Sequence, residues 1–510
     1  MNVTTIRASR SGAIVMSSEM PRQTQISSCF PLKLTDFEHY AFFDDSPQHP
    51  MVIVMRTLLE GEVDTVILKQ AIDECLMENP LLRANIRDGW SPRWCLPDDF
   101  RLHFDVIETG SEDPSTRCPP RRIDLTKDIG VQFELRRGTQ RSVLVAWFHH
   151  ACVDGIAAIR FLGDIFARYG AQTARGDAEK PVIRNIDHSI LRQRGTRRMP
   201  GSTGDRRAPL VHTLMETFRL FGRRAYRLLR RPPSLQPAAN RANPNIIQTR
   251  ILPRDVTRRL KRLASEHGVT TNDVSMLVFL DQLERWAPGN AQRRPSDLFR
   301  VLMPVSMRNP EHDRISAANV LSYVFHSYRR SEIRDTNALL ARIHGKSHQM
   351  LTRNEGAAML YGFAIARRIP GLFRFSRRVQ PDYATTVLTN VGEVRRLFEN
   401  RFPLRKGRAV AGNLLIQSVD GVAPVRENTN IAMAFGTYGG EMIIHVSRNT
   451  RLFSEADVDL LLDALVDRIT ELTEQPATST RDFEMAVPSA EYTTSTAAAA
   501  PADHSSQVPA

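Results

Sequence analysis

The chain has 510 residues, of which 42% are hydrophobic and 25% charged, and its net charge is +13. A chain of this length and apolar content can bury a large core, and we expect two domains. No run of about eighteen apolar residues is present, which excludes a membrane-spanning helix. The five cysteines are scattered without a C-x-x-C pair. This usage fits a reducing cytoplasm better than a disulfide framework or a zinc site.

Both ends of the chain read as disordered. Residues 1–29 are polar and rich in Ser and Thr, and their longest apolar run, Ala13–Met16, is too short for a secretory signal. Residues 475–510 are rich in Ala, Ser, Thr and Pro. We therefore place the folded part at residues 30–474, of which 30–180 form the N-terminal subdomain.

The N-terminal subdomain opens with alternating strand and helix patterns. Met51–Leu59 is rich in β-formers, and Asp64–Glu78 has helical spacing that ends at Asn79-Pro80. An extended segment is expected to resume at 81–84. A short strand, Val131–Leu135, precedes the hairpin turn Arg137-Gly138. These patterns predict a mixed α/β layer.

The stretch Ser142–Tyr169 combines a strand, a short connection and a helix. Strand formers run from Val143 to Phe148, and helical spacing of apolar residues begins at Ile156. The connection carries His149, His150, Asp154 and Gly155, in the order H-H-x-x-x-D-G. Such a pattern arises by chance in on the order of one in a thousand chains of this length. A junction of this kind often holds a functional site.

The residue types in this motif suit proton transfer. An imidazole with a pKa near 6.5 is a natural general base for an alcohol or amine. Neighbouring side chains on a strand point in opposite directions, so only one histidine can face a substrate. A purely structural alternative is that Asp154 caps the helix, Gly155 lets the turn close and the histidines are buried. No third ligand with convincing spacing supports a metal site.

The same connection contains Cys152, a rival nucleophile. We interpret it as a small buried hydrophobic residue.

Residues 181–245 read as a basic linker. The segment from Arg192 to Arg231 contains twelve arginines and only two acidic residues, Asp205 and Glu216, so it carries +10 of the net charge. Its centre, Leu210–Leu229, is expected to form a basic amphipathic helix. Such a helix suits an anionic membrane surface, although it would equally serve as a crossover packed on the domains. The arginines lack interleaved aromatic residues, so nucleic acid is not the expected partner.

The C-terminal subdomain is expected over residues 246–474. A strand at Ile246–Leu252 and a helix at Asp255–Glu266 precede a second helix that Thr271 would cap. A long strand at Phe299–Met307 ends beside Arg308. Further strands and helices follow, the last at Glu455–Leu472. Because a buried carboxylate requires an opposite charge, we choose Arg308 as the partner of Asp154.

The H-H-x-x-x-D-G order resembles the signature of the CoA-dependent acyltransferase superfamily. That superfamily includes chloramphenicol acetyltransferase, the condensation domains of nonribosomal peptide synthetases and the bacterial wax ester synthase/diacylglycerol acyltransferases. The resemblance implies that His150 is the catalytic base, with His149 beside it. It also implies that Asp154 is structural and pairs with an arginine, and that Gly155 keeps an acyl tunnel open.

Other segments resemble the wax ester synthase/diacylglycerol acyltransferases in particular. SPQHPM (46–51) is similar to their S-P-x-x-P-M opening, and the helix start G-x-T-x-N-D-V supplies Asn272 and Asp273. TTVLTN resembles their L-T-N-x-x-G segment through Asn390. We regard these three residues as candidates for substrate binding or the oxyanion hole. A departure occurs at Ile129-Gly130-Val131, where these enzymes carry P-L-W.

The resemblance implies an α/β (α+β) fold of two chloramphenicol-acetyltransferase-like subdomains, with mixed sheets flanked by helices and a central active-site tunnel. The expected reaction transfers an acyl group from acyl-CoA, a co-substrate, to a hydroxyl of the fatty alcohol or diacylglycerol type. No metal or other cofactor is implied. We expect a cytoplasmic protein, with peripheral attachment to the inner membrane face if the linker helix binds lipid.

Three alternatives remain open. The first is a stand-alone condensation enzyme that takes its acyl group from a carrier-protein thioester and forms an ester or amide. The second is a short-chain acetyltransferase acting on a polyketide or glycolipid, and the third is a catalytically silent lipid-binding or partner-binding member.

Overall fold

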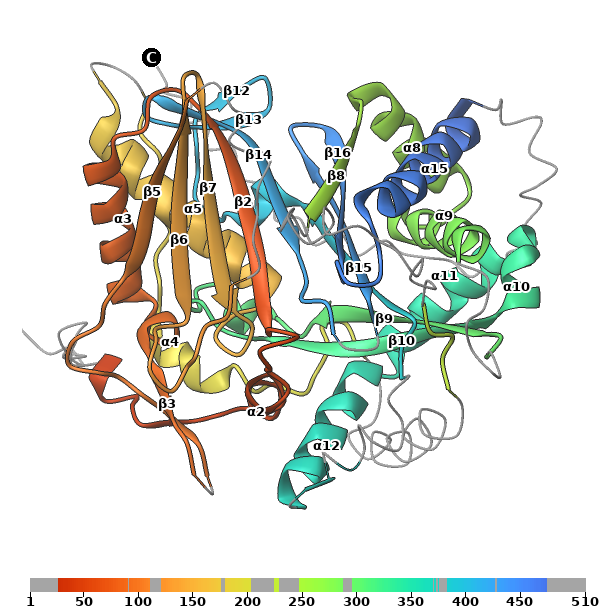
Figure 1. The fold of residues 1–510 in the computed structure, drawn as a ribbon, viewed down its shortest axis with the longest axis horizontal. Helices are drawn as coiled ribbons and strands as arrows, with labels where there is room; N and C mark the ends of the chain where they lie inside the picture. The colour runs from red at the N-terminus through yellow and green to blue at the C-terminus, as the bar shows by residue number, and fades with distance from the viewer. Residues whose placement is uncertain are drawn as a thin grey trace, which may run out of the picture.

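Two lobes, each built on one large β-sheet, lie side by side (Figure 1). The computed structural model describes residues 26–89, 91–110, 121–175, 179–202, 224–228, 247–287, 296–369, 371–372, 375, 383–426 and 429–474. The predicted disordered tail and most of the predicted N-terminal lead lie outside these residues. The mixed α/β prediction is confirmed, whereas a central tunnel stays a prediction.

The first lobe contains a seven-stranded sheet in the order β12-β13-β14-β2-β7-β6-β5. Helices α3 and α5 pack against each other and cover one face of it (Figure 1). The strands are β2 (Val52–Glu60), β5 (His103–Gly110), β6 (Val131–Gly138), β7 (Arg141–His149), β12 (Leu404–Arg405), β13 (Arg408–Ala411) and β14 (Leu414–Val422). The helices of this lobe are α2 (Asp36–Phe43), α3 (Thr65–Glu78), α4 (Pro80–Arg83) and α5 (Gly155–Thr173). A small sheet of β1 (Leu32–Lys33), β4 (Arg93–Cys95) and β3 (Asn85–Arg87) and the 3₁₀ helix η1 (His188–Gln193) complete it.

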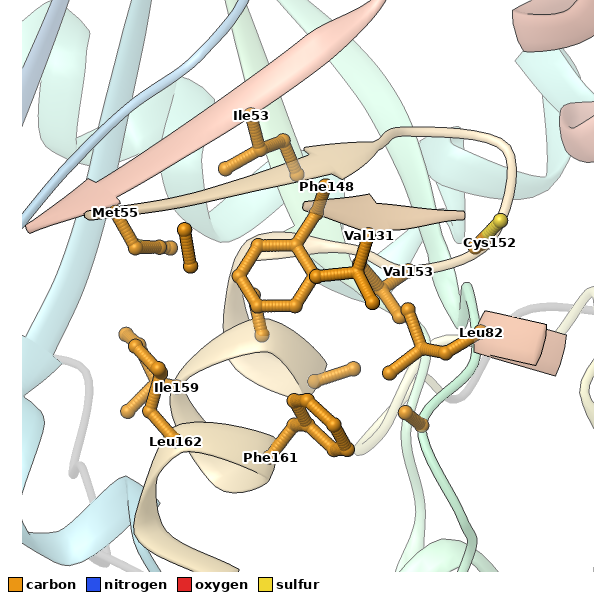
Figure 2. Packing of buried hydrophobic residues seen from close by; sticks show 14 of the residues in the cluster. Ile53, Met55, Leu82, Val131, Phe148, Cys152, Val153, Ile159, Phe161 and Leu162 are labelled. Carbon is orange, nitrogen blue, oxygen red and sulfur yellow. The ribbon is translucent and has the colours of Figure 1, made fainter. Parts of the chain in front are cut away.

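Strand β7 is the central element of the first lobe. It pairs antiparallel with β2 and β6, and every residue from Ser142 to His149 is buried. A strand covered on both faces needs a nearly continuous apolar run, which the sequence supplies. Figure 2 shows Phe148 of β7 and Val153 of the following turn packed into a cluster with Phe161 of α5. The turn after β7 is therefore attached to a rigid core.

The second lobe contains a six-stranded sheet in the order β10-β9-β11-β15-β16-β8. Helices α8, α9 and α15 contact one another on the side away from the first lobe (Figure 1). The strands are β8 (Ile247–Leu252), β9 (Leu298–Ser306), β10 (Leu321–Arg329), β11 (Thr386–Glu393), β15 (Ile431–Tyr438) and β16 (Glu441–Arg448). The helices are α8 (Arg254–Glu266), α9 (Thr271–Trp286), α10 (Arg330–Arg334), α11 (Thr336–Thr352), α12 (Glu355–Arg368), α14 (Val394–Leu397) and α15 (Glu455–Glu474), with the 3₁₀ helix η2 (Pro310–His312) between β9 and β10.

The division of the chain into lobes is not contiguous. Strand β14 pairs with β2, with Leu415 opposite Glu60, so the segment from β12 to β14 belongs to the sheet of the first lobe. The chain then returns to the second lobe at β15. The expectation of a contiguous C-terminal subdomain over 246–474 is therefore wrong for residues 404–422. The chain therefore crosses from the second lobe to the first and back again between β11 and β15.

The basic amphipathic helix predicted at Leu210–Leu229 is described only at residues 224–228, which are not helical. Tyr226 and Leu228 are buried in the core of the second lobe. The main chain of Tyr226 donates to Leu298 O, and its ring stacks on Phe299 at 4.8 Å. Residues 224–228, near the C-terminal end of the predicted helix, therefore pack against the second lobe and do not form a helix. The rest of that prediction lies outside the described residues.

Two local expectations were wrong by small amounts. The segment expected to be extended at 81–84 begins with the short helix α4, because Pro80 fits the first turn of a helix. The N-cap of α9 is Thr270 and not Thr271. Within the described residues, none of the helices has the length and apolar character needed to cross a bilayer.

Candidate active site

His150 lies in the turn that follows β7 and is 6% exposed. Its main-chain N–H donates to Met51 O at 2.7 Å, which ties the turn to the start of β2. Its Nδ1 lies 2.9 Å from Val153 O. Since a carbonyl oxygen only accepts, this contact assigns the proton to Nδ1 and leaves a lone pair on Nε2. That is the tautomer required of a general base acting through Nε2.

The surroundings of His150 keep its imidazole neutral. Burial is the largest influence and lowers its pKa below the usual 6.5, although the Val153 carbonyl and the Asp154 carboxylate act in the opposite direction. The Arg426 guanidinium lowers this pKa further. At neutral pH the ring is therefore ready to accept a proton.

His149 has the contacts of a structural residue. Its Nδ1 accepts from the N–H of Ala151 at 3.1 Å, so its proton is on Nε2, 4.0 Å from Asp45 Oδ1. Burial, the neighbouring His150 and Arg426 lower its pKa to about 3. His149 therefore shapes the turn, and only His150 has the free lone pair that the predicted base requires.

Asp154 connects the motif to the second lobe. Its carboxylate receives two hydrogen bonds from Arg308, at 2.8 and 3.0 Å, and one from the N–H of Val320 at 2.8 Å. It also caps α5 by accepting from the N–H of Ala157. Burial raises the pKa of Asp154, but Arg308 and these hydrogen bonds outweigh burial and lower it overall. The predicted Asp154–Arg308 pair is confirmed, and Asp154 also caps α5, which is one part of the structural alternative.

Gly155 is the first residue of α5. Its φ lies outside the left-handed region, and a Cβ at this position would meet no heavy atom within 4 Å. Neither backbone conformation nor close packing therefore requires glycine here. The space beside Gly155 is open, as the expected role of keeping a tunnel clear would need.

Asn319 is a site residue that the sequence reasoning did not select. It lies in the loop between β9 and β10, is 2% exposed, and donates its amide to the carbonyls of His150 at 2.7 Å and Ala151 at 2.8 Å. The sequence signal was the Ala318-Asn319 pair, which resembles the start of a G-N-x-x-S segment of the wax ester synthase/diacylglycerol acyltransferases, with Ala318 in place of glycine. Together with Arg308, Asn319 makes the geometry of the histidine turn dependent on the second lobe.

Arg426 is a second residue that the sequence analysis did not select, and it contacts the loop on which the histidine turn rests. It lies between β14 and β15, and it contacts the Asp44 carboxylate at 2.9 Å and the carbonyls of Asp44 and His49. Those residues belong to the loop that ends at Met51, the acceptor for His150 N–H. Arg426 therefore positions the segment on which His150 rests.

The three further candidates, Asn272, Asp273 and Asn390, do not form one site. Asp273 is 1% exposed and is occupied by a capping box with Thr270 and by contacts with His344 and Ser347 of α11. Asn390 is exposed and donates to Asn272 Oδ1 at 3.1 Å. Asp273 thus has only structural contacts, whereas Asn272 and Asn390 form a pair at the start of α9 and the end of β11. A role for this pair in substrate binding stays a prediction.

Aromatic side chains from both lobes surround one side of His150. The ring of Phe37 in α2 lies 5.3 Å from the His150 ring and 5.3 Å from the ring of Tyr323 in β10. Tyr40 stacks on Phe363 of α12 at 4.5 Å. We call Phe37, Tyr40, Tyr323 and Phe363 the aromatic wall. An apolar wall beside the base excludes water from this side of the site.

Cys152 is fully buried, and burial raises the pKa of its thiol well above the usual range. A neutral buried thiol is a poor nucleophile, which agrees with its interpretation as a small hydrophobic residue. Its Sγ lies so close to Gly130 that a Cβ there would clash at 2.2 Å. Among the described side chains, no group of three His, Cys, Asp or Glu residues is arranged to hold a metal ion.

Comparison with known proteins shows the fold of this chain. No family model matches it. It is 28% identical over 159 residues to the hybrid PKS-NRPS synthetase pyvA of Aspergillus violaceofuscus, a stretch covering 28% of this chain and only 4% of that much longer protein.

Two solved structures cover most of the chain. The cyclization-docking bidomain of the EpoB nonribosomal peptide synthetase from Sorangium cellulosum has a TM-score of 0.60 at 16% identity, covering 90% of this chain and 87% of that one. The trichothecene 15-O-acetyltransferase TRI3 from Fusarium sporotrichioides has a TM-score of 0.59 at 11% identity, covering 86% and 94%. The chain therefore has the two-lobed fold of the condensation-domain and chloramphenicol-acetyltransferase type.

Proposed function

We propose that this chain is an O-acyltransferase that moves an acyl group from acyl-CoA to an alcohol, with His150 as the general base. The observation that carries this proposal is the hydrogen bond between His150 Nδ1 and Val153 O, which leaves Nε2 unprotonated in a buried turn. The fold shared with an O-acetyltransferase supports it. The resemblance to wax ester synthase/diacylglycerol acyltransferases supports a fatty alcohol or diacylglycerol as acceptor, and rests on the sequence motifs alone.

The reaction needs one base and no covalent enzyme intermediate. Nε2 of His150 removes the acceptor hydroxyl proton as the oxygen attacks the thioester carbonyl carbon. The C–S bond then breaks, and the proton passes from Nε2 to the departing thiolate, which restores the neutral ring. Asp154 takes no part in proton transfer, because its carboxylate is held by Arg308 and Val320. A base positioned in this way contributes about 10²–10⁴-fold to the rate.

A carrier-protein thioester is the second candidate donor. The similarity to a nonribosomal peptide synthetase bidomain and to part of a hybrid synthetase favours it. Both donors present the same thioester to His150, so the chemistry of the base is unchanged. With an amine acceptor the product would be an amide.

The deciding experiment measures thiol release from acyl-CoAs, from acetyl to palmitoyl, with and without hexadecanol or diacylglycerol. We expect acceptor-dependent release that falls about 10²–10⁴-fold in His150→Gln. His103→Gln is a matched control, because His103 lies on the edge strand β5. A folded protein that releases no thiol from any CoA donor, but acts on an acyl carrier protein, would replace the first donor by the second. Equal rates for His150→Gln and the wild type would contradict the proposed base.

A further inference from the structure

Tyr323 lies at the boundary between the lobes, and the ring of Phe37 connects its ring to that of His150. It follows the Asn319–Val320 segment at the start of β10, and its ring contacts Phe37, which in turn contacts the ring of His150. Arg426 lowers the pKa of both His150 and Tyr323. The base, the Tyr323 ring and the Arg426 guanidinium therefore belong to one buried cluster.

The hydroxyl of Tyr323 is the uncommitted donor of this cluster. Tyr40 donates its hydroxyl to Asp44 at 3.2 Å, and Ser322, which precedes Tyr323, donates to Gly356 O at 2.6 Å. Within the part of the chain that the structure describes, no group accepts a hydrogen bond from the Tyr323 hydroxyl, although the residue is only 8% exposed. The Tyr323 oxygen is not among the buried polar atoms without a partner, so it keeps some accessible surface. A ligand atom at this surface could accept from it, as water otherwise would.

Tyr323 keeps its proton in this position and is therefore able to donate a hydrogen bond. Burial is the largest influence on its pKa and raises it above the usual 10, so the phenol remains protonated throughout the working pH range. A neutral phenol beside a developing negative charge gives a hydrogen bond without losing its proton.

We propose that the Tyr323 hydroxyl donates a hydrogen bond to the thioester carbonyl oxygen as that oxygen gains negative charge. This assignment rests on the proposed acyl transfer. The acceptor oxygen bonds to the carbonyl carbon, electrons move onto the carbonyl oxygen, and they return as the C–S bond breaks and the thiolate takes the proton from His150. Tyr323 keeps its proton throughout. A donor that strengthens only in the transition state acts on kcat.

The test compares Tyr323→Phe with Tyr328→Phe. Tyr328 lies on the same strand and its hydroxyl is bonded to His326 at 2.9 Å. We expect kcat to fall about 10²-fold in Tyr323→Phe, with KM for both substrates little changed, because one oxyanion donor is commonly responsible for 10²–10³-fold. Tyr328→Phe should retain the wild-type kcat. Removing one oxygen leaves the ring packing in place, and a thermal melt verifies that each variant is folded.

A second measurement replaces Tyr323 by fluorotyrosines of increasing acidity. A more acidic phenol is a stronger donor, so kcat should rise along the series as long as the phenol remains protonated. Unchanged kcat in Tyr323→Phe, or a higher KM for the acceptor alone, would overturn the assignment while leaving acyl transfer intact. A wild-type protein that releases no thiol from any thioester would instead overturn the proposed function, and this assignment with it.

Discussion

The side-chain amide of Asn319 donates to the main-chain carbonyl of His150 at 2.7 Å, across the boundary between the two lobes. A second bond from the same amide, to Ala151 O, holds the next peptide. The orientation of His150, the proposed base, is therefore fixed by a residue 169 positions further along the chain. The proposed catalysis would therefore depend on how the lobes meet.

Replacing Asn319 by Ala should lower both stability and kcat. Two buried carbonyls would lose their donor, and each unsatisfied buried group costs about 1–3 kcal/mol. We expect the free energy of unfolding, measured by urea denaturation, to fall by about 2–6 kcal/mol. Asn413→Ala, in the β13–β14 turn, is the control variant. A stable Asn319→Ala protein with wild-type kcat would contradict the positioning role.

The Asp154–Arg308 pair should be sensitive to removal of either charge alone. Arg308→Met leaves a buried carboxylate without its cation, which typically costs 3–5 kcal/mol. Asp154→Asn strands the guanidinium instead and should cost a similar amount. Thermal melts of these single variants and of the double variant would measure the coupling. Single effects that simply add in the double variant would argue against a specific pair.

Arg426 should affect the pH dependence of catalysis as well as stability. Its charge lowers the pKa of His150, so Arg426→Gln should move the acid limb of the kcat/KM profile to higher pH. Asp44→Asn breaks the same ion pair but keeps the cation, so it should leave that limb in place. If both variants shift the limb equally, the effect is structural and not electrostatic.

The pH profile of the wild type should itself report a buried base. Because the pKa of His150 is lowered from 6.5, the acid limb of the kcat/KM profile should be centred below pH 6.5. Initial rates at saturating acceptor and low thioester would test this. An acid limb centred above pH 7 would exclude His150 in this environment as the titrating group.

Acid should destabilise the fold before the carboxylates titrate. Burial lowers the pKa of His149 to about 3 and the pKa values of His326 and His445 to about 4. The unfolded chain binds these protons near pH 6.5 and the folded chain does not, so stability is full above 6.5 and falls as pH drops toward 4. Each histidine contributes about 1.4 kcal/mol per pH unit in this window. Urea unfolding at pH 7 and pH 5 measures the loss, and His445→Gln should reduce its slope.

Local elements are predictable from short stretches of the sequence. The apolar run of β7 predicts a buried strand, the cap by Asp154 was one of two interpretations of that residue, and the spacing of α3 matches its boundaries. The need of a buried carboxylate for an opposite charge identified Arg308, whereas the choice of His150 as the base came from the family resemblance of the H-H-x-x-x-D-G order and stays a proposal. These features are readable because periodicity, capping and charge pairing act through residue type and short-range spacing.

The meeting of distant segments is visible only in the folded chain. The pairing of β14 with β2 placed residues 404–422 in the first lobe, although nothing in their spacing distinguishes one sheet edge from another. The amide of Asn319 and the guanidinium of Arg426 reach the histidine turn because the lobes bring them there. The tautomers of His149 and His150 follow from the main-chain atoms that each ring meets. Such contacts depend on the packing of the whole chain, since side chains of the same type elsewhere in the sequence carry the same local signal.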